Sequence, residues 1–172
     1  MTGIAGTGHR PEKLGGHGIQ TRLALGGLAT EYLSVQRPSK VISGMAPGWD
    51  QALAGAAVAL NIPFIAAVPF AGQHKRWPAE SQERYLRLLG MAEDVVNVAG
   101  SFPPISGIQV SRAMQARNEW MVDRADKMVA LWDGSWGGTF NCVRYAEKKG
   151  VPIDNLWSRW TLPPDLRDLL AI

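Results

Sequence analysis

Short apolar runs alternate with longer stretches of helical pattern along the whole chain. The apolar runs predict buried strands at residues 4–5, 40–42, 64–68, 94–98, 128–132 and 152–156. Apolar residues spaced three and four apart, or runs of good helix formers, predict helices at residues 19–35, 49–60, 78–92, 111–125 and 139–149. This alternation, with strands apolar on both faces, is typical of an α/β fold. We expect a Rossmann-like, doubly wound, mainly parallel sheet with helices on both faces.

The length of 172 residues fits a single domain. We expect residues 1–160 to form one Rossmann-like ligand-binding domain and residues 161–172 to form a short C-terminal helical tail. Apolar residues at helical spacing lie in this tail, at Leu166, Leu169, Leu170 and Ile172. Docking of the tail on the core and recruitment of a partner both remain open. A hydrophobic content of 46% excludes a disordered chain, and no apolar run is long enough to cross a membrane.

The charge balance is mildly basic, with 18 Lys and Arg against 15 Asp and Glu and a pI near 9.2. Its basic clusters are short, such as Lys148 and Lys149, so the sequence predicts neither a nucleic-acid partner nor a membrane partner. A single cysteine, Cys142, forms no internal disulfide, and the N-terminus lacks the pattern of a signal peptide. We therefore expect a cytoplasmic protein.

Several familiar site types are missing from the sequence. His9, His17 and His74 lack the spacing of metal ligands, so we expect no metal. Neither a dinucleotide fingerprint nor a P-loop is present, and we expect no cofactor. A Gly-x-Ser-x-Gly elbow is also missing, which argues against a serine hydrolase.

Three loops rich in small residues follow the first, second and fifth predicted strands. Because the carboxyl ends of parallel strands meet at one sheet edge, these loops predict a ligand site there. Glycine lets backbone N–H groups approach an anion, and a helix N-terminus adds positive potential, although each loop alone could be a plain turn. The candidate ligand-binding residues are Gly6, Thr7, Gly8, His9 and Arg10; Ser43, Gly44, Met45, Gly48, Trp49 and Asp50; and Asp133, Gly134, Ser135, Gly137, Gly138 and Thr139.

A further candidate pair, Arg117 and Asn118, lies one helical turn from Met114 and Met121. Either ligand contact or a buried polar network would explain this pair. Arg10 and Arg117 would neutralise a phosphate held by Gly137, Gly138 and Thr139, and Asp50 or Asn118 would contact a ribose. Tryptophans in or beside loops could stack on a base, and these are Trp49, Trp77 and Trp136. His9 is a proton donor, an acid/base group or a structural hydrogen-bonding residue.

These motifs, in this order, resemble the SLOG superfamily over about residues 1–157. They are Gly6-Thr7-Gly8-His9-Arg10, Ser43-Gly44-Met45-Ala46-Pro47-Gly48-Trp49-Asp50, Arg117-Asn118-x-x-Met121-Val122-Asp123 and Asp133-Gly134-x-x-Gly137-Gly138-Thr139. The chain is most similar to the YpsA/YspA-like branch, whose members are often encoded by phages or bacteria. Related families include the Lonely Guy phosphoribohydrolases and the DprA/Smf DNA-binding proteins. The resemblance implies a Rossmann-like fold that senses or processes a nucleotide-derived ligand.

One departure from the Lonely Guy pattern affects the predicted chemistry. Asn141 and Cys142 stand where those enzymes carry the glutamates that support glycosidic cleavage. Our first hypothesis is therefore a sensor or binding protein for a nucleoside phosphate or an NAD- or ADP-ribose-like molecule. The alternative is a nucleotide N-glycosidase, with Asp50 as the candidate catalytic residue. A DprA-like DNA-binding protein is a third hypothesis, and homo-oligomer formation remains open.

Overall fold

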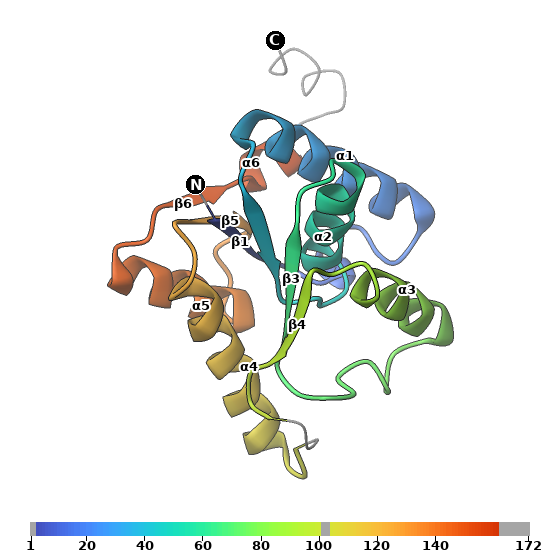
Figure 1. Ribbon diagram of the computed structural model, residues 1–172, viewed down its shortest axis with the longest axis vertical. Coiled ribbons are helices and arrows are strands. Elements are labelled where there is room, and N and C mark those ends of the chain that lie inside the picture. The colour runs from blue at the N-terminus through green and yellow to red at the C-terminus, as the bar shows by residue number, and fades with distance from the viewer. Residues whose placement is uncertain (1–2, 101–103, 162–172) are drawn as a thin grey trace.

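Six parallel strands form one sheet in the computed structural model, which describes residues 3–100 and 104–161 (Figure 1). The strands are β1 (Gly3–Gly8), β2 (Lys40–Ser43), β3 (Phe64–Val68), β4 (Asp94–Asn97), β5 (Lys127–Leu131) and β6 (Ile153–Asn155). Each strand pairs with its neighbours in parallel, in the order β4-β3-β2-β1-β5-β6. The predicted α/β fold is confirmed.

The strand order reverses between β1 and β5. From β1 the chain adds β2, β3 and β4 toward one edge, then returns to place β5 on the other side of β1. In the register, Ala5 of β1 lies between Ile42 of β2 and Met128 of β5. A crevice opens at such a reversal, outside the carboxyl ends of the strands, and this is where ligands bind in open α/β sheets.

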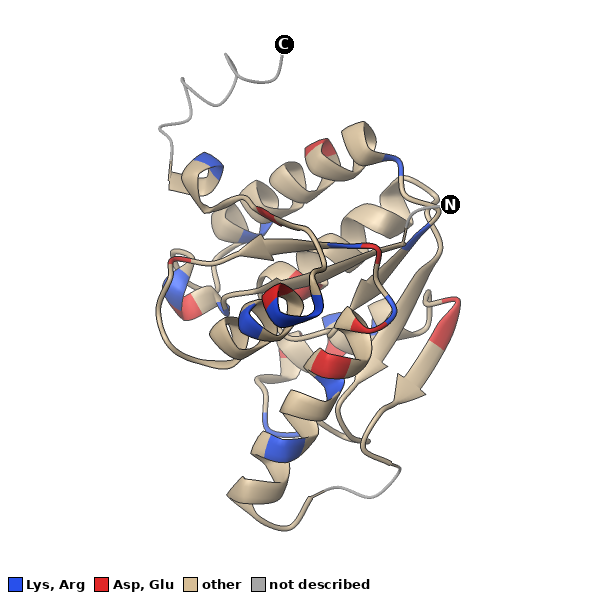
Figure 2. Ribbon diagram, turned by 90° about the vertical axis from the view of Figure 1, so that its left-hand side faces the viewer, with Lys and Arg blue, Asp and Glu red and all other residues tan. Residues whose placement is uncertain are grey.

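Helices cover both faces of the sheet (Figure 1). On one face lie α1 (Ile19–Gln36), α2 (Trp49–Ala59), α3 (Ala79–Leu89) and the short α6 (Trp157–Thr161). On the other face lie α4 (Gly107–Val122) and α5 (Gly138–Lys149). A core of buried apolar residues lies under each layer, because parallel strands expose an apolar surface on both faces. Basic and acidic residues are interspersed along these elements (Figure 2).

A few helices and strands begin or end at residues other than those predicted. The helix expected from residue 111 begins at Gly107, because the Ser106 hydroxyl caps it by accepting from the backbone N–H of Gln109 at 3.3 Å. Two short elements were not predicted, a 3₁₀ helix at Pro11–Lys13 and α6. The predicted tail, apart from residue 161, lies outside the described residues. Within those residues, no helix has both the length and the apolar character that a membrane span requires.

Candidate functional site

A cavity of about 420 Å³ opens at the carboxyl ends of β1 and β5, where the strand order reverses. The sequence-predicted residues that line it are Thr7, Gly8, His9, Arg10, Asp50, Arg117, Asn118, Ser135, Gly137, Gly138 and Thr139. The other predicted residues lie outside the lining, and these are Gly6, Ser43, Gly44, Met45, Gly48, Trp49, Asp133 and Gly134. The three loops therefore meet as expected, but part of their sequence builds the cavity instead of facing it.

Arg117 is the central polar residue of the cavity wall. Its side chain is 10% exposed, and its Nη1 donates to the backbone oxygen of Gly44 at 2.6 Å. Its Nε donates to Oδ1 of Asn118 at 3.1 Å, and Nδ2 of Asn118 donates to the backbone oxygen of Gly138 at 3.2 Å. This pair on α4 therefore links the loop after β2 to the start of α5. The buried network that the sequence left open is present, and both side chains also line the cavity.

Asp50 is buried at the start of α2 beside this network. Its Oδ2 lies 3.7 Å from Nη1 of Arg117, whereas its Oδ1 is buried and has no hydrogen-bond partner in the structure. Burial raises the pKa of the Asp50 carboxyl to about 6, although Arg117, the backbone N–H of Ala46 and Arg10 act in the opposite direction. A buried oxygen without a donor is costly, so Asp50, a residue of the cavity wall, keeps an unused acceptor just beneath the cavity surface.

The loop after β2 is shaped by contacts that leave no room for larger residues. A Cβ on Gly44 would lie 1.8 Å from Nη1 of Arg117, so only glycine admits this guanidinium. Gly48 has φ +95°, and a Cβ there would lie 2.6 Å from the backbone oxygen of His9. The Ser43 hydroxyl donates to the backbone oxygen of Asp50 at 2.7 Å and accepts from the N–H of Met45 at 3.1 Å. These residues hold the loop in place for Asp50.

Glycines in β1 make room for α2. A Cβ on Gly6 would lie 2.4 Å from Cδ2 of Leu53, and a Cβ on Gly8 would lie 2.6 Å from Cβ of Trp49. Trp49 itself is fully buried in the core. The expectation that Trp49 could stack on a base is therefore corrected, because its indole packs against β1 and does not reach the cavity.

Trp136 is the loop tryptophan that faces the cavity. Its side chain is 84% exposed, and its ring lies 4.3 Å from the ring of Phe140, between centroids. Trp77, another candidate, instead packs edge-on against the ring of Tyr85 at 5.3 Å. Of the three indoles considered for stacking, Trp136 thus has the position and the exposure for it.

His9 and Asp133 join the loops after β1 and β5. Nε2 of His9 lies 2.6 Å from Oδ1 of Asp133, and the same oxygen accepts from the backbone N–H of Ser135 at 2.9 Å. Hydrogen bonds from Ser135, followed by the contact with His9, lower the pKa of Asp133 far below its ordinary value. A carboxylate held in this way stays ionised, so Asp133 serves as a loop anchor and not as a proton carrier.

The loop after β5 leads into α5 with an open N-terminus. Gly137 has φ 147° and precedes the first helical residue, and a Cβ on Gly137 or on Gly138 would meet nothing within 4 Å. Backbone N–H groups of a first helical turn have no partner inside the helix and carry partial positive charge. The rim of the cavity at Gly137 and Gly138 is therefore free of side chains and carries positive potential.

Four further residues line the cavity that were not candidates in the sequence, and these are Glu12, Lys13, Ala46 and Met114. Lys13 reaches the cavity because the 3₁₀ turn folds it back, and its Nζ donates to Oγ of Ser135. Its place two residues after Pro11, close behind His9 and Arg10, was the only signal in the sequence. The cavity thus collects three cations, Arg10, Lys13 and Arg117.

Two bacterial proteins are similar to this chain in sequence. It is 33% identical over 159 residues to the uncharacterized SPbeta prophage-derived protein YoqJ of Bacillus subtilis (strain 168), covering 83% of this chain and 86% of that protein. It is 24% identical over 102 residues to a UPF0398 protein of Bacillus thuringiensis (strain Al Hakam), covering 59% of this chain and 53% of that protein. The chain thus spans about half of the second relative. No protein-family model matches the chain.

Solved structures share the fold. DNA processing protein A (DprA) of Streptococcus pneumoniae superposes with a TM-score of 0.59 at 14% identity, over 88% of this chain and 49% of that one. DprA of Helicobacter pylori, described for its single-stranded DNA binding mode, gives 0.59 at 19% identity over 88% of this chain and 63% of that one. TM1055 gives 0.58 at 13% identity, over 89% of this chain and 72% of that one. The chain has the SLOG-like fold of these proteins and spans about half of the first.

Proposed function

The chain belongs to the family of the prophage-derived protein YoqJ, and from that membership and the site geometry we propose that it binds a nucleotide-derived small molecule, as a sensor or binding protein. YoqJ is itself uncharacterized, so the relative supplies no activity. The YpsA/YspA-like resemblance of the motifs supports the same class of ligand. The ligand class is otherwise argued from the cavity.

The observation that carries this proposal is the unpartnered Oδ1 of Asp50 in the wall of a cavity that is also lined by three cations, Arg10, Lys13 and Arg117, and by one further carboxylate, Glu12. The open N-terminus of α5 and the guanidinium of Arg117 favour an anion such as a phosphate. A carboxylate oxygen beside them favours a hydroxyl that donates to it, as the hydroxyls of a ribose do. A ligand that carries both groups, a nucleoside phosphate or an ADP-ribose-like molecule, satisfies both features at once.

The third feature is the exposed indole of Trp136 at the same rim. An aromatic ring that is free on one face can stack on a nucleobase, and such stacking contributes about 1–3 kcal/mol per base. Phosphate, ribose and base would then have separate partners around one cavity of about 420 Å³, within the ordinary range of ligand pockets.

An N-glycosidase is the second candidate, and the position of Asp50 is the observation that favours it. With a pKa of about 6, this carboxyl can hold or release a proton near neutral pH. The route of the Lonely Guy enzymes has no support here. Asn141 is exposed, and burial raises the pKa of the Cys142 thiol to about 11, so neither replaces the missing carboxylates.

Binding is tested by isothermal titration calorimetry with nucleoside monophosphates, NAD and ADP-ribose. At least one of these should bind, and Arg10→Ala should weaken it more than tenfold, because Arg10 is exposed and lines the cavity. Arg144→Ala is the matched control, since Arg144 is exposed on α5 and pairs with Glu147. If no compound binds, or if both variants bind like the wild type, the proposal is wrong.

Turnover is tested with the same compounds by chromatography of free base. Release of base that stops in Asp50→Asn would establish the glycosidase. Binding of an intact ligand that is recovered unchanged after long incubation would establish the binding protein. A single-stranded oligonucleotide in the same titrations separates both from DNA binding, which should weaken steeply with salt.

A further inference from the structure

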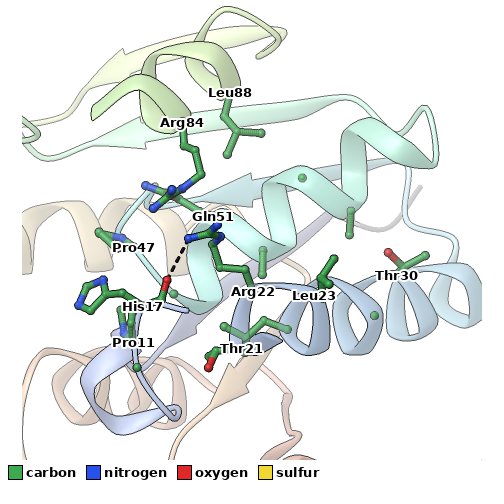
Figure 3. Close-up of a pocket in the computed structure, with 18 residues that line it drawn as sticks. Pro11, His17, Thr21, Arg22, Leu23, Thr30, Pro47, Gln51, Arg84 and Leu88 are labelled. Carbon is green, nitrogen blue, oxygen red and sulfur yellow. Dashed lines mark hydrogen bonds between the residues drawn. The ribbon is translucent and has the colours of Figure 1, made fainter. Parts of the chain in front are cut away.

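A second cavity, of about 470 Å³, lies in a groove between α1, α2 and α3 (Figure 3). It is separated from the candidate site by two loops. Pro11 and Pro47 face the groove, whereas their neighbours Arg10 and Ala46 face the candidate site. The volume lies within the range of pockets for small organic ligands, about 300–1,000 Å³. Nothing in the proposed function uses this groove.

The floor of the groove is kept open by three glycines in the middle of helices. Gly26 and Gly27 lie in α1 and Gly55 lies in α2, and a Cβ on any of them would meet nothing within 4 Å. Glycine inside a helix lowers stability relative to alanine, because it loses more backbone freedom on folding. These glycines make room for no other side chain among the described residues. They leave an empty channel beside Leu23 and Leu88.

One end of the groove is basic. Figure 3 shows the side chains of Arg22 and Arg84 close together there, near His17 and Gln51. Oε1 of Glu80 forms ion pairs with both guanidiniums, at 2.7 Å from Nη1 of Arg84 and 3.5 Å from Nη2 of Arg22.

No carboxylate lines the groove within residues 3–100 and 104–161. The nearby acids sit at its rim, where Glu80 is 70% exposed and Glu12 pairs with His17 at 3.0 Å. Besides Glu80, Nη1 of Arg22 donates to the backbone oxygen of His17 at 2.9 Å, and Nη2 of Arg84 donates to Oγ of Ser81 at 3.1 Å. A guanidinium has five N–H donors, so each arginine keeps donors for an added anion.

We propose that this groove is a second binding site, for a small amphipathic anion. The carboxylate or phosphate head of that anion contacts Arg22 and Arg84, because guanidinium groups bind oxyanions through paired hydrogen bonds. Its apolar body lies along the glycine floor and buries apolar surface against α1, α2 and α3. In Figure 3 the two arginines lie at one end and Leu23 lies farther along α1, an arrangement that favours one molecule lying lengthwise in the groove. A second copy of the chain and an acidic peptide are the competing occupants.

Decanoate is the probe, titrated by calorimetry, with decan-1-ol and acetate as controls that keep only the tail or only the head. Decanoate should bind at least tenfold more tightly than either control. Arg84→Ala should remove most of that advantage, whereas Arg87→Ala should not, since Arg87 lies outside the groove and pairs with Glu83 at 3.1 Å. Equal binding of decanoate and decan-1-ol would overturn the assignment of the charged end.

The glycine floor is tested by Gly27→Leu, which fills open space and should abolish decanoate binding while the protein stays folded. Ala59→Leu is the matched control, because Ala59 is an exposed residue of α2 outside the groove. If light scattering shows a dimer that Gly27→Leu dissociates, and decanoate does not bind, the groove is an interface and the proposal fails. Tight binding of an acidic peptide in place of decanoate would also overturn it. Trp136→Ala should leave decanoate binding unchanged, which keeps this result independent of the candidate site.

Discussion

The two cavities of this protein have similar volumes, about 420 and 470 Å³, but opposite construction. The candidate site is walled by buried polar groups that hold one another, with Arg117 joined to Gly44 and Asn118. The walls of the groove are helices that carry glycine at three of the lining positions, Gly26, Gly27 and Gly55. A change in the first should therefore disturb the whole network, whereas an added group in the second should meet empty space.

Glycine shows the difference most directly. Near the candidate site, a Cβ on Gly8 would lie 2.6 Å from Trp49, and one on Gly44 would lie 1.8 Å from Arg117. In the groove, a Cβ on Gly26 or on Gly55 would meet nothing within 4 Å. Glycine thus serves close packing in β1 and in the loop after β2, whereas in the groove it leaves open space, as Gly137 and Gly138 do at the start of α5.

Arg117→Met should have the largest effect, because it removes the cation beside buried Asp50. Loss of one partner of a buried ion pair typically costs about 3–5 kcal/mol. Urea unfolding at pH 8 should show a fall of that size in the free energy of unfolding. Arg112→Met is the control, since Arg112 is exposed on the same helix and should change it by less than about 0.5 kcal/mol. Adding Asp50→Asn to Arg117→Met should restore part of the loss, and an additive double variant would show that the two side chains are not coupled.

The second largest effect should be the change in the free energy of unfolding with pH. A substitution in the candidate site should alter this pH dependence, whereas one in the groove should not. The pKa of Asp50 is about 6 in the folded protein against an ordinary 3.8, so the folded state holds this proton more tightly. The contribution of protonated Asp50 to the free energy of unfolding is complete below pH 3.8. It is lost as the pH rises through 6, by roughly 3 kcal/mol in all. Unfolding in urea between pH 4 and 8 should show this decline in the wild type but not in Asp50→Asn. A wild type that gains stability relative to Asp50→Asn over this range would contradict the raised pKa.

Arg84→Ala supplies the contrast in the groove. The side chain of Arg84 is 29% exposed and its partner Glu80 is 70% exposed, so solvent screens the pair. The free energy of unfolding of Arg84→Ala should therefore change with pH as it does in the wild type, between pH 4 and 8.

Much of the fold follows from the sequence, because alternation of apolar runs and helical patterns determines an α/β sheet. The strand at residues 64–68 and the helix beginning at residue 19 are confirmed, since both have strong local signals. The reversal of strand order next to β1 placed three loops together, as the rule for parallel sheets predicts.

The sequence could not predict which loop residues face the cavity and which pack in the core. Trp49 directly follows one glycine-rich loop and Trp136 lies within another, yet Trp49 is buried under β1 and Trp136 is 84% exposed. Only the packing of α2 against β1 separates them, and that contact joins residues far apart in sequence. The groove was also missed, because a helical glycine looks the same whether it faces a neighbour or empty space.

Gly8→Ala tests the close packing of β1 against α2 beside the candidate site. The added methyl would overlap the buried ring of Trp49, and overpacking of this kind costs about 1–3 kcal/mol. Thermal unfolding should therefore show a lower melting temperature. Gly8 lacks a positive φ, so the loss would report steric overlap and not backbone strain. An unchanged melting temperature would mean that α2 moves away from β1 at no cost.

Gly26→Ala should have the smallest effect, and its sign should be opposite. The methyl group would enter open space, and alanine is favoured over glycine in a helix by about 0.5–1 kcal/mol. The melting temperature should therefore rise, while the binding of nucleotides at the candidate site should stay the same. A fall in stability would show that the groove is already filled in solution, by a second copy or another chain, because only a filled groove would resist one added methyl. The same variant measured over a range of protein concentrations decides between these outcomes, since stability that depends on concentration indicates self-association.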